Sequence, residues 1–202
     1  MVSALVRVGL ATLVLGGLAA SASGCASAHD TIQREFTPGQ LQQGSNVHAF
    51  QAATWPEAML RPLFCRYSAG MKYGDHVDGA IMGDPGSQVR SDIAMTVCLS
   101  DPADYDGGEL IIDAAGVPAA WRGNAGDVIV YPADTLHRVT EVTRGTRDVA
   151  ISWIQSMVRE GARRRILFDL KTTLEAFDAL PVPPVETEAI RRSYLNLIRM
   201  WA

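Results

Sequence analysis

Alternating apolar and polar residues run through the middle of the chain in short segments. The clearest is 91–100, where two sets of side chains alternate between opposite faces of an extended chain: Ile93, Met95, Val97 and Leu99 against Ala94, Thr96 and Cys98. This pattern predicts a half-buried strand. Similar runs predict strands at 64–67, 72–77, 109–113, 127–131, 137–142 and 149–157. Turn-like clusters of Gly, Pro and Asp separate them, at 84–87, 104–108, 123–126 and 143–146. Many short strands with closely spaced turns predict a mainly β domain, a sandwich or jelly roll.

After Val158 the apolar residues recur at three- and four-residue steps, which predicts helices. The first carries Leu167, Leu170, Leu174 and Phe177, and the second carries Ile190, Tyr194, Leu197, Ile198 and Trp201. Prolines in 181–184 break the pattern because proline lacks an amide donor. We expect this C-terminal pair of α-helices to pack against the sheet, and the alternative is a homodimer interface.

Residues 1–28 differ from the rest of the chain and resemble a leader. Arg7 is their only charged residue, and the apolar run at 8–20 is too short to span a bilayer but fits a signal-peptide core. The small residues ending in Gly24-Cys25 resemble a lipoprotein cleavage box, with Ala22 where Leu is usual. A genuine leader predicts a periplasmic or membrane-anchored protein, lipidated at Cys25. The alternative is a mis-assigned gene start.

The composition indicates one soluble domain. With 202 residues, 48% of them hydrophobic, and a formal net charge of -4, the chain does not suggest a polyanion-binding surface, and no nucleic acid is expected. We interpret Arg163–Arg165 as the solvated face of a helix start. Cys65 and Cys98 fall in strand-like runs and are expected to be buried and free. The predicted organisation is a leader, a lead-in region, a jelly-roll core and a helical extension, at 1–28, 29–60, 61–158 and 159–202.

The segment Tyr73–Gly79 contains the candidate chemistry. Residues i and i+2 of a strand share a face, so His76 and Asp78 can offer a nitrogen and an oxygen to one ion. His137, at the start of a later predicted strand, is the natural third ligand. Two histidines and one carboxylate form the facial triad of non-haem Fe(II) oxygenases, which leaves positions open for O₂ and a co-substrate. Each motif alone is weak evidence for a metal.

A buried arginine strengthens this interpretation. Arg147 begins an apolar strand, where an unpaired guanidinium is costly, so we expect it to bind the distal carboxylate of a keto-acid. Arg144 is a competing choice, but it precedes Gly145 in a predicted turn and is expected to be solvated. Arg138 should point away from the side of His137. Two phenols near the predicted site could bond the bound carboxylate or simply pack: Tyr67 and Tyr73.

Six segments of the chain closely resemble bacterial PKHD-type hydroxylases, Fe(II)/2-oxoglutarate-dependent dioxygenases related to prolyl 4-hydroxylases. The segments are 63–67, 73–78, 104–110, 125–132, 136–147 and 153–159. The resemblance implies a double-stranded β-helix fold, a cytoplasmic location and a link to iron uptake. It also implies iron ligands at His76, Asp78 and His137, 2-oxoglutarate bound by Arg147, and L-ascorbate (vitamin C) as a reductant. The leader-like run stands where the family has a segment that helps to cover the active-site mouth.

The main hypothesis is therefore a dioxygenase that couples decarboxylation of 2-oxoglutarate to succinate with O₂-dependent hydroxylation of a small molecule or peptide. One alternative is a non-catalytic iron-binding jelly roll, such as a surface lipoprotein. Another is a cupin-like zinc hydrolase, which needs a general base beside the metal and gives Arg147 no role.

Overall fold

The computed structural model describes residues 45–114, 116–178, 180 and 184–202. The leader-like run, Cys25 and most of the proline-rich break lie outside the described residues, so the predictions made for them stay predictions. None of the helices in the described ranges is both long and apolar enough to span a bilayer.

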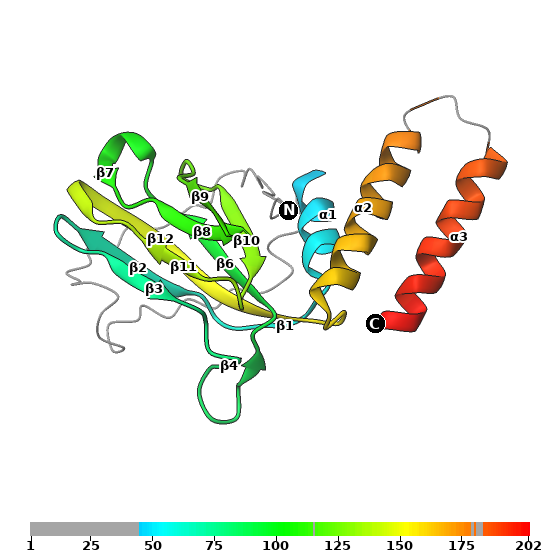
Figure 1. Cartoon of the computed structure of the whole chain (residues 1–202), viewed down its shortest axis with the longest axis horizontal. Coiled ribbons are helices and arrows are strands. Elements are labelled where there is room, and N and C mark those ends of the chain that lie inside the picture. Colours follow the sequence, from blue (N-terminus) through cyan, green and yellow to red (C-terminus); the bar gives the residue numbers. More distant parts are fainter. Residues whose placement is uncertain (1–44, 115, 179, 181–183) are drawn as a thin grey trace.

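Short strands dominate the described chain between two helical ends (Figure 1). The helices are α1 (Ser45–Thr54), η2 (Pro102–Asp104, a 3₁₀ turn), α2 (Gly161–Asp178) and α3 (Pro184–Trp201). The first six strands are β1 (Pro56–Met59), β2 (Leu63–Ser68), β3 (Tyr73–His76), β4 (Ile81–Met82), β5 (Val89–Arg90) and β6 (Ile93–Cys98). The remaining strands are β7 (Tyr105–Gly107), β8 (Leu110–Ala114), β9 (Val117–Trp121), β10 (Val128–Pro132), β11 (His137–Val139) and β12 (Val142–Ser156).

Two antiparallel sheets enclose the main core. The larger has the order β1-β12-β6-β10, with β2 and β7 also paired to β12, and the smaller has the order β3-β11-β8-β9. Inward side chains from both sheets form one cluster: Cys65, Ala94, Ile129 and Val149 come from the larger sheet, and Leu110, Ile112 and Val139 from the smaller. This arrangement confirms the mainly β, double-stranded β-helix fold, with the C-terminal helices that the sequence predicted.

Strand β6 is buried on both faces, so the prediction of a half-buried strand is wrong. Its inward face joins the jelly-roll core, while Ile93 and Met95 on its outer face pack with Phe50 of α1 and Phe168 of α2. Helices α1 and α2 cover the face that carries Ile93 and Met95, so neither face of this strand is left to solvent. The turn predicted at 143–146 is also wrong, because these residues continue β12 and pair with β7.

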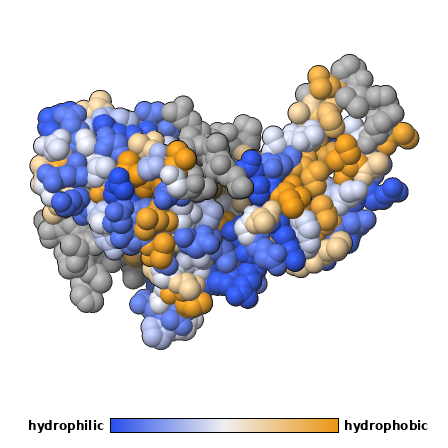
Figure 2. Space-filling view, viewed as in Figure 1, coloured by the Kyte–Doolittle hydropathy of each residue, from blue (hydrophilic) through white to orange (hydrophobic). Residues whose placement is uncertain are grey.

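The C-terminal helices pack mainly on each other and on α1. Leu167 and Leu174 of α2 and Tyr194 of α3 are buried in a separate cluster, and Tyr194 lies beside Trp55 with ring centroids 6.5 Å apart. Helix α2 reaches the sheet through Phe168, whereas α3 packs on α2. The expectation that both helices lie on the sheet therefore holds only for α2. Figure 2 shows hydrophobic residues gathered over this helical pair, and the homodimer alternative stays a prediction.

Candidate metal and keto-acid site

Two neighbouring strands of the smaller sheet bring the metal candidates together. His137 of β11 lies opposite His76 of β3 in antiparallel register, and the ring centroids are 4.1 Å apart. Asp78 follows the end of β3, and its backbone amide donates to the carbonyl of Ala133 at 3.1 Å. One ligand atom from each of the three side chains lies within 4.8 Å of the other two. The structure thus gathers residues that are about sixty positions apart in the sequence.

The donor atoms of this cluster suit a cation. Asp78 Oδ1 is 3.9 Å from the Nε2 atoms of both histidines, which is too long for hydrogen bonds, while metal–ligand bonds of about 2.1 Å fit these separations. The Nδ1 atoms lie 2.8 Å from Gly74 O and 2.9 Å from Thr135 O. If each Nδ1 donates to that carbonyl, both Nε2 lone pairs are free for a metal.

The charge state of the cluster is also favourable. Asp78 Oδ2 is buried and has no hydrogen-bond partner among the described residues, a costly arrangement that a cation would relieve. Burial lowers the pKa of His137 below its ordinary value, which favours the neutral, metal-binding imidazole. These three residues therefore fit a divalent metal.

Arg147 projects from β12 into the jelly roll and is only 3% exposed. Its guanidinium lies 5.2 Å from the centroid of the Tyr67 ring, and no acidic residue in the described chain forms a salt bridge with it. A Cβ on Gly108 would approach Arg147 Cδ to 3.0 Å, so the glycine makes room for the side chain. The structure leaves a buried positive charge available to an anionic ligand.

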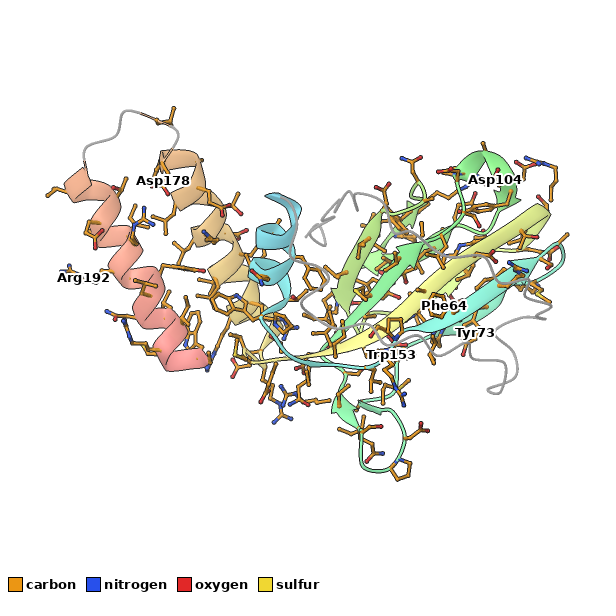
Figure 3. All side chains as sticks on the ribbon, turned by 180° about the vertical axis from the view of Figure 1, so that it is seen from behind. Phe64, Tyr73, Asp104, Trp153, Asp178 and Arg192 are labelled. Atoms are coloured by element: carbon orange, nitrogen blue, oxygen red, sulfur yellow. The ribbon has the colours of Figure 1, made fainter. Side chains whose placement is uncertain are left out.

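The two candidate tyrosines occupy different positions. Tyr67 is buried beside Arg147, whereas Tyr73 is 40% exposed and its ring meets the His76 ring edge-on at 4.4 Å. Figure 3 labels Tyr73 and Trp153 in the jelly roll, well separated from the helical pair that carries Asp178 and Arg192. Tyr67 thus lies beside the arginine, and Tyr73 lies beside the metal candidate His76.

Sequence reasoning did not assign a role to two further aromatic residues. Tyr131 is buried with its ring edge-on to His137 at 5.0 Å, and burial raises the pKa of its phenol. Trp153 lies in the same row of the sheet, because Ala94 pairs with both residues, and its buried Nε1 has no partner among the described residues. The signal that could have identified them is inward alternation on predicted strands.

The other expectations for individual side chains have mixed outcomes. Arg138 and Arg144 are exposed, as expected, and pair with Asp75 and Asp106. Cys65 and Cys98 are buried thiols outside any disulfide, as predicted. Arg164 was expected to be solvated, but it is only 7% exposed, and its guanidinium donates to backbone carbonyls instead.

Sequence comparisons with known proteins identify the family of this chain. The sequence model of the 2OG-Fe(II) oxygenase superfamily matches residues 62–155. A PKHD-type hydroxylase of Caulobacter sp. is 44% identical over 76% of this chain and 69% of its own length. A PKHD-type hydroxylase of Hyphomonas neptunium is 49% identical over the same shares. A solved Pseudomonas putida prolyl-4-hydroxylase aligns with 24% identity and a TM-score of 0.40 over 51% of this chain and 55% of its own.

The fold and the sequence match define the class, an Fe(II)- and 2-oxoglutarate-dependent oxygenase. Because the solved structure overlaps only in part, the finer assignment depends on the sequence relatives. By them, the chain belongs to the PKHD-type hydroxylases of that superfamily. It is a dioxygenase that uses O₂ and 2-oxoglutarate.

Proposed function

We propose that His76, Asp78 and His137 hold the Fe(II) of this dioxygenase and that Arg147 holds the distal carboxylate of 2-oxoglutarate. The observation that carries the metal assignment is the cluster of two imidazoles and the Asp78 carboxylate: one ligand atom of each lies within 4.8 Å of the others, and the buried Oδ2 of Asp78 has no partner among the described residues. A hydrolytic site would need a general base beside the metal, and would leave the buried Arg147 without a function.

The bound iron and 2-oxoglutarate supply the oxidising chemistry that couples decarboxylation to succinate with hydroxylation of the substrate. The residues of this chain position those groups. The carbonyl groups of Gly74 and Thr135 orient the two imidazoles. The Arg147 guanidinium selects a dicarboxylate, because charge-assisted bonds contribute about 1.5–3 kcal/mol each. Tyr67 supports that guanidinium through its ring face.

Tyr73 is proposed to lie at the mouth of the site, where its exposed ring can contact 2-oxoglutarate or the substrate.

Ascorbate is proposed as the reductant that restores Fe(II), on the family resemblance alone. A succinate assay with and without ascorbate tests this role. Equal numbers of turnovers with and without ascorbate would contradict this role.

Spectroscopy tests the site directly. Under anaerobic conditions, Fe(II) and 2-oxoglutarate together should give the wild-type protein a visible charge-transfer band, and His137→Ala should lose it. Arg138→Ala is the matched control, because Arg138 neighbours His137 but is exposed. A band of wild-type strength in folded His137→Ala would contradict the metal assignment.

A further inference from the structure

Arg164 links the C-terminal helix α2 to the start of β6. Its Nη1 atom donates to Val158 O at 2.9 Å and to Arg159 O at 2.8 Å, and its Nη2 atom reaches Asp92 O at 3.4 Å. Figure 1 shows that α2 begins where β12 ends, so this side chain lies at the junction of the two parts of the molecule. Burying a guanidinium is costly unless its N–H groups are hydrogen-bonded, and these backbone carbonyls supply those bonds.

Asp92 is the centre of that junction. Its carboxylate accepts hydrogen bonds from Arg90 Nε at 2.8 Å and from the backbone amide of Ser156 at 2.9 Å. Its carbonyl accepts from Arg164 and also from the backbone amide of Ala133, the latter at 3.3 Å. Asp92 therefore connects β5, β12 and α2 to the loop between β10 and β11.

That loop orients two of the three proposed metal ligands. Ala133 O accepts the amide of Asp78 at 3.1 Å, and Thr135 O lies 2.9 Å from Nδ1 of His137. The residue between them, Asp134, acts electrostatically on Arg164: burial lowers the pKa of this arginine, and the charges of Asp92 and Asp134 oppose that shift. Arg164 thus contacts Asp92, which is bonded to the loop, and interacts electrostatically with Asp134 of the loop.

We infer that Arg164 is a positioning residue for the metal centre, acting through Asp92 O and the loop at 133–135 on Asp78 and His137. The inference depends on the proposed function, because it takes these residues as the metal ligands. A change at Arg164 should let the loop shift, so that the carboxylate and the imidazole no longer converge on one point. The C-terminal helix would then contribute to iron affinity, although it supplies no ligand.

Anaerobic Co(II) titration of the purified full chain tests this inference. Arg164→Met keeps the length of the side chain and removes the guanidinium, and it should weaken Co(II) binding by about 10–100-fold, as is typical when a partner of a metal ligand is lost. The visible Co(II) spectrum should change as well, because it reports ligand geometry. Arg165→Met is the matched control: it removes an exposed ion pair with Asp169 on the same helix, and should bind Co(II) as the wild type does.

Affinity is measured at a temperature where circular dichroism shows every variant to be folded, so a loss of stability alone leaves it unchanged. If Arg164→Met does not fold, Arg164→Lys replaces it, and a smaller loss of affinity in the same direction is expected. Wild-type affinity and spectrum in whichever variant folds would overturn the inference. Wild-type affinity in His137→Ala would instead overturn the proposed metal site, so the two failures are distinguishable.

Discussion

Arg147 and Arg164 are both buried arginines, but their surroundings differ. The guanidinium of Arg164 donates to three backbone carbonyls, those of Val158 and Arg159 just before α2 and that of Asp92 just before β6. The guanidinium of Arg147 faces the Tyr67 ring and forms no salt bridge with an acidic residue in the described chain. At the scale of single residues, this difference separates an arginine that holds the fold together from one that is available to a ligand.

Replacing Arg147 should weaken 2-oxoglutarate binding. Arg147→Gln removes the positive charge, and the dissociation constant of 2-oxoglutarate should rise about 10–100-fold, since a charge-assisted bond contributes about 1.5–3 kcal/mol. Titrating the anaerobic charge-transfer band measures this constant. Arg144→Gln, an exposed arginine of the same strand, is the control and should leave it unchanged. Equal constants in both variants would contradict the assigned role of Arg147.

Glu109 should contribute to stability in a pH-dependent way. A hydrogen bond from the Thr140 hydroxyl, partly offset by burial and aided by Arg122, lowers the pKa of this carboxyl below its ordinary 4.5. Because the folded pKa is the lower one, the stabilisation is complete above the unfolded pKa and is lost as the pH falls through the folded pKa.

Glu109→Gln should therefore reduce the free energy of unfolding at pH 7 but not at strongly acidic pH. Urea unfolding at several pH values measures the difference. Glu141→Gln, at an exposed neighbouring position, is the control. A deficit of constant size down to acidic pH would exclude this electrostatic explanation.

Strand β12 is the element that organises the molecule. It pairs with β1, β2, β6 and β7 along its fifteen residues, and its inward face carries Arg147 and Trp153. Near its start the strand passes very close to the end of η2. Gly145 has a positive φ of 72°, and a Cβ there would lie 2.0 Å from Asp104 O. Only glycine satisfies both constraints.

Gly145→Ala should destabilise the protein by more than the cost of placing an alanine at a positive φ. Gly70→Ala is the matched control, because Gly70 also has a positive φ but nothing lies within 4 Å of the position of its Cβ. The control should cost about 1–2 kcal/mol, and Gly145→Ala should cost more because backbone atoms must move. Urea denaturation measures both. Equal losses would show that the close approach is unimportant.

At the scale of the whole molecule, the jelly roll and the helical pair have separate cores. The cluster of Val158, Leu167, Leu174 and Tyr194 joins α2 and α3, while Phe168 connects α2 to the outer face of the larger sheet. Helix α2 follows β12 in the chain, and α3 follows α2 (Figure 1). The junction around Arg164 is where the helical part can influence the proposed metal centre.

Truncating the core of the helical pair should lower stability without affecting the metal site. Leu174→Ala should cost about 2–5 kcal/mol, because the side chain is 2% exposed. It lies ten residues beyond Arg164, so the Co(II) affinity of the folded protein should stay at the wild-type value. Leu195→Ala, at an exposed position of α3, is the control and should cost much less in thermal unfolding. A large loss of Co(II) affinity in Leu174→Ala would mean that the whole helical pair, rather than the junction, supports the site.

The sequence by itself determined the positions of most core strands and of both C-terminal helices, because alternation and helical periodicity are local properties. It also identified His76, Asp78, His137 and Arg147 as candidates, since residue type and strand spacing restrict which side chains can share a face. Only the tertiary structure decided that β6 is buried on both faces and that Arg164 donates to Asp92 O, which also accepts the amide of Ala133. Those features depend on contacts among α1, α2 and the sheet. These segments are far apart in the sequence, so no local pattern predicts that they meet.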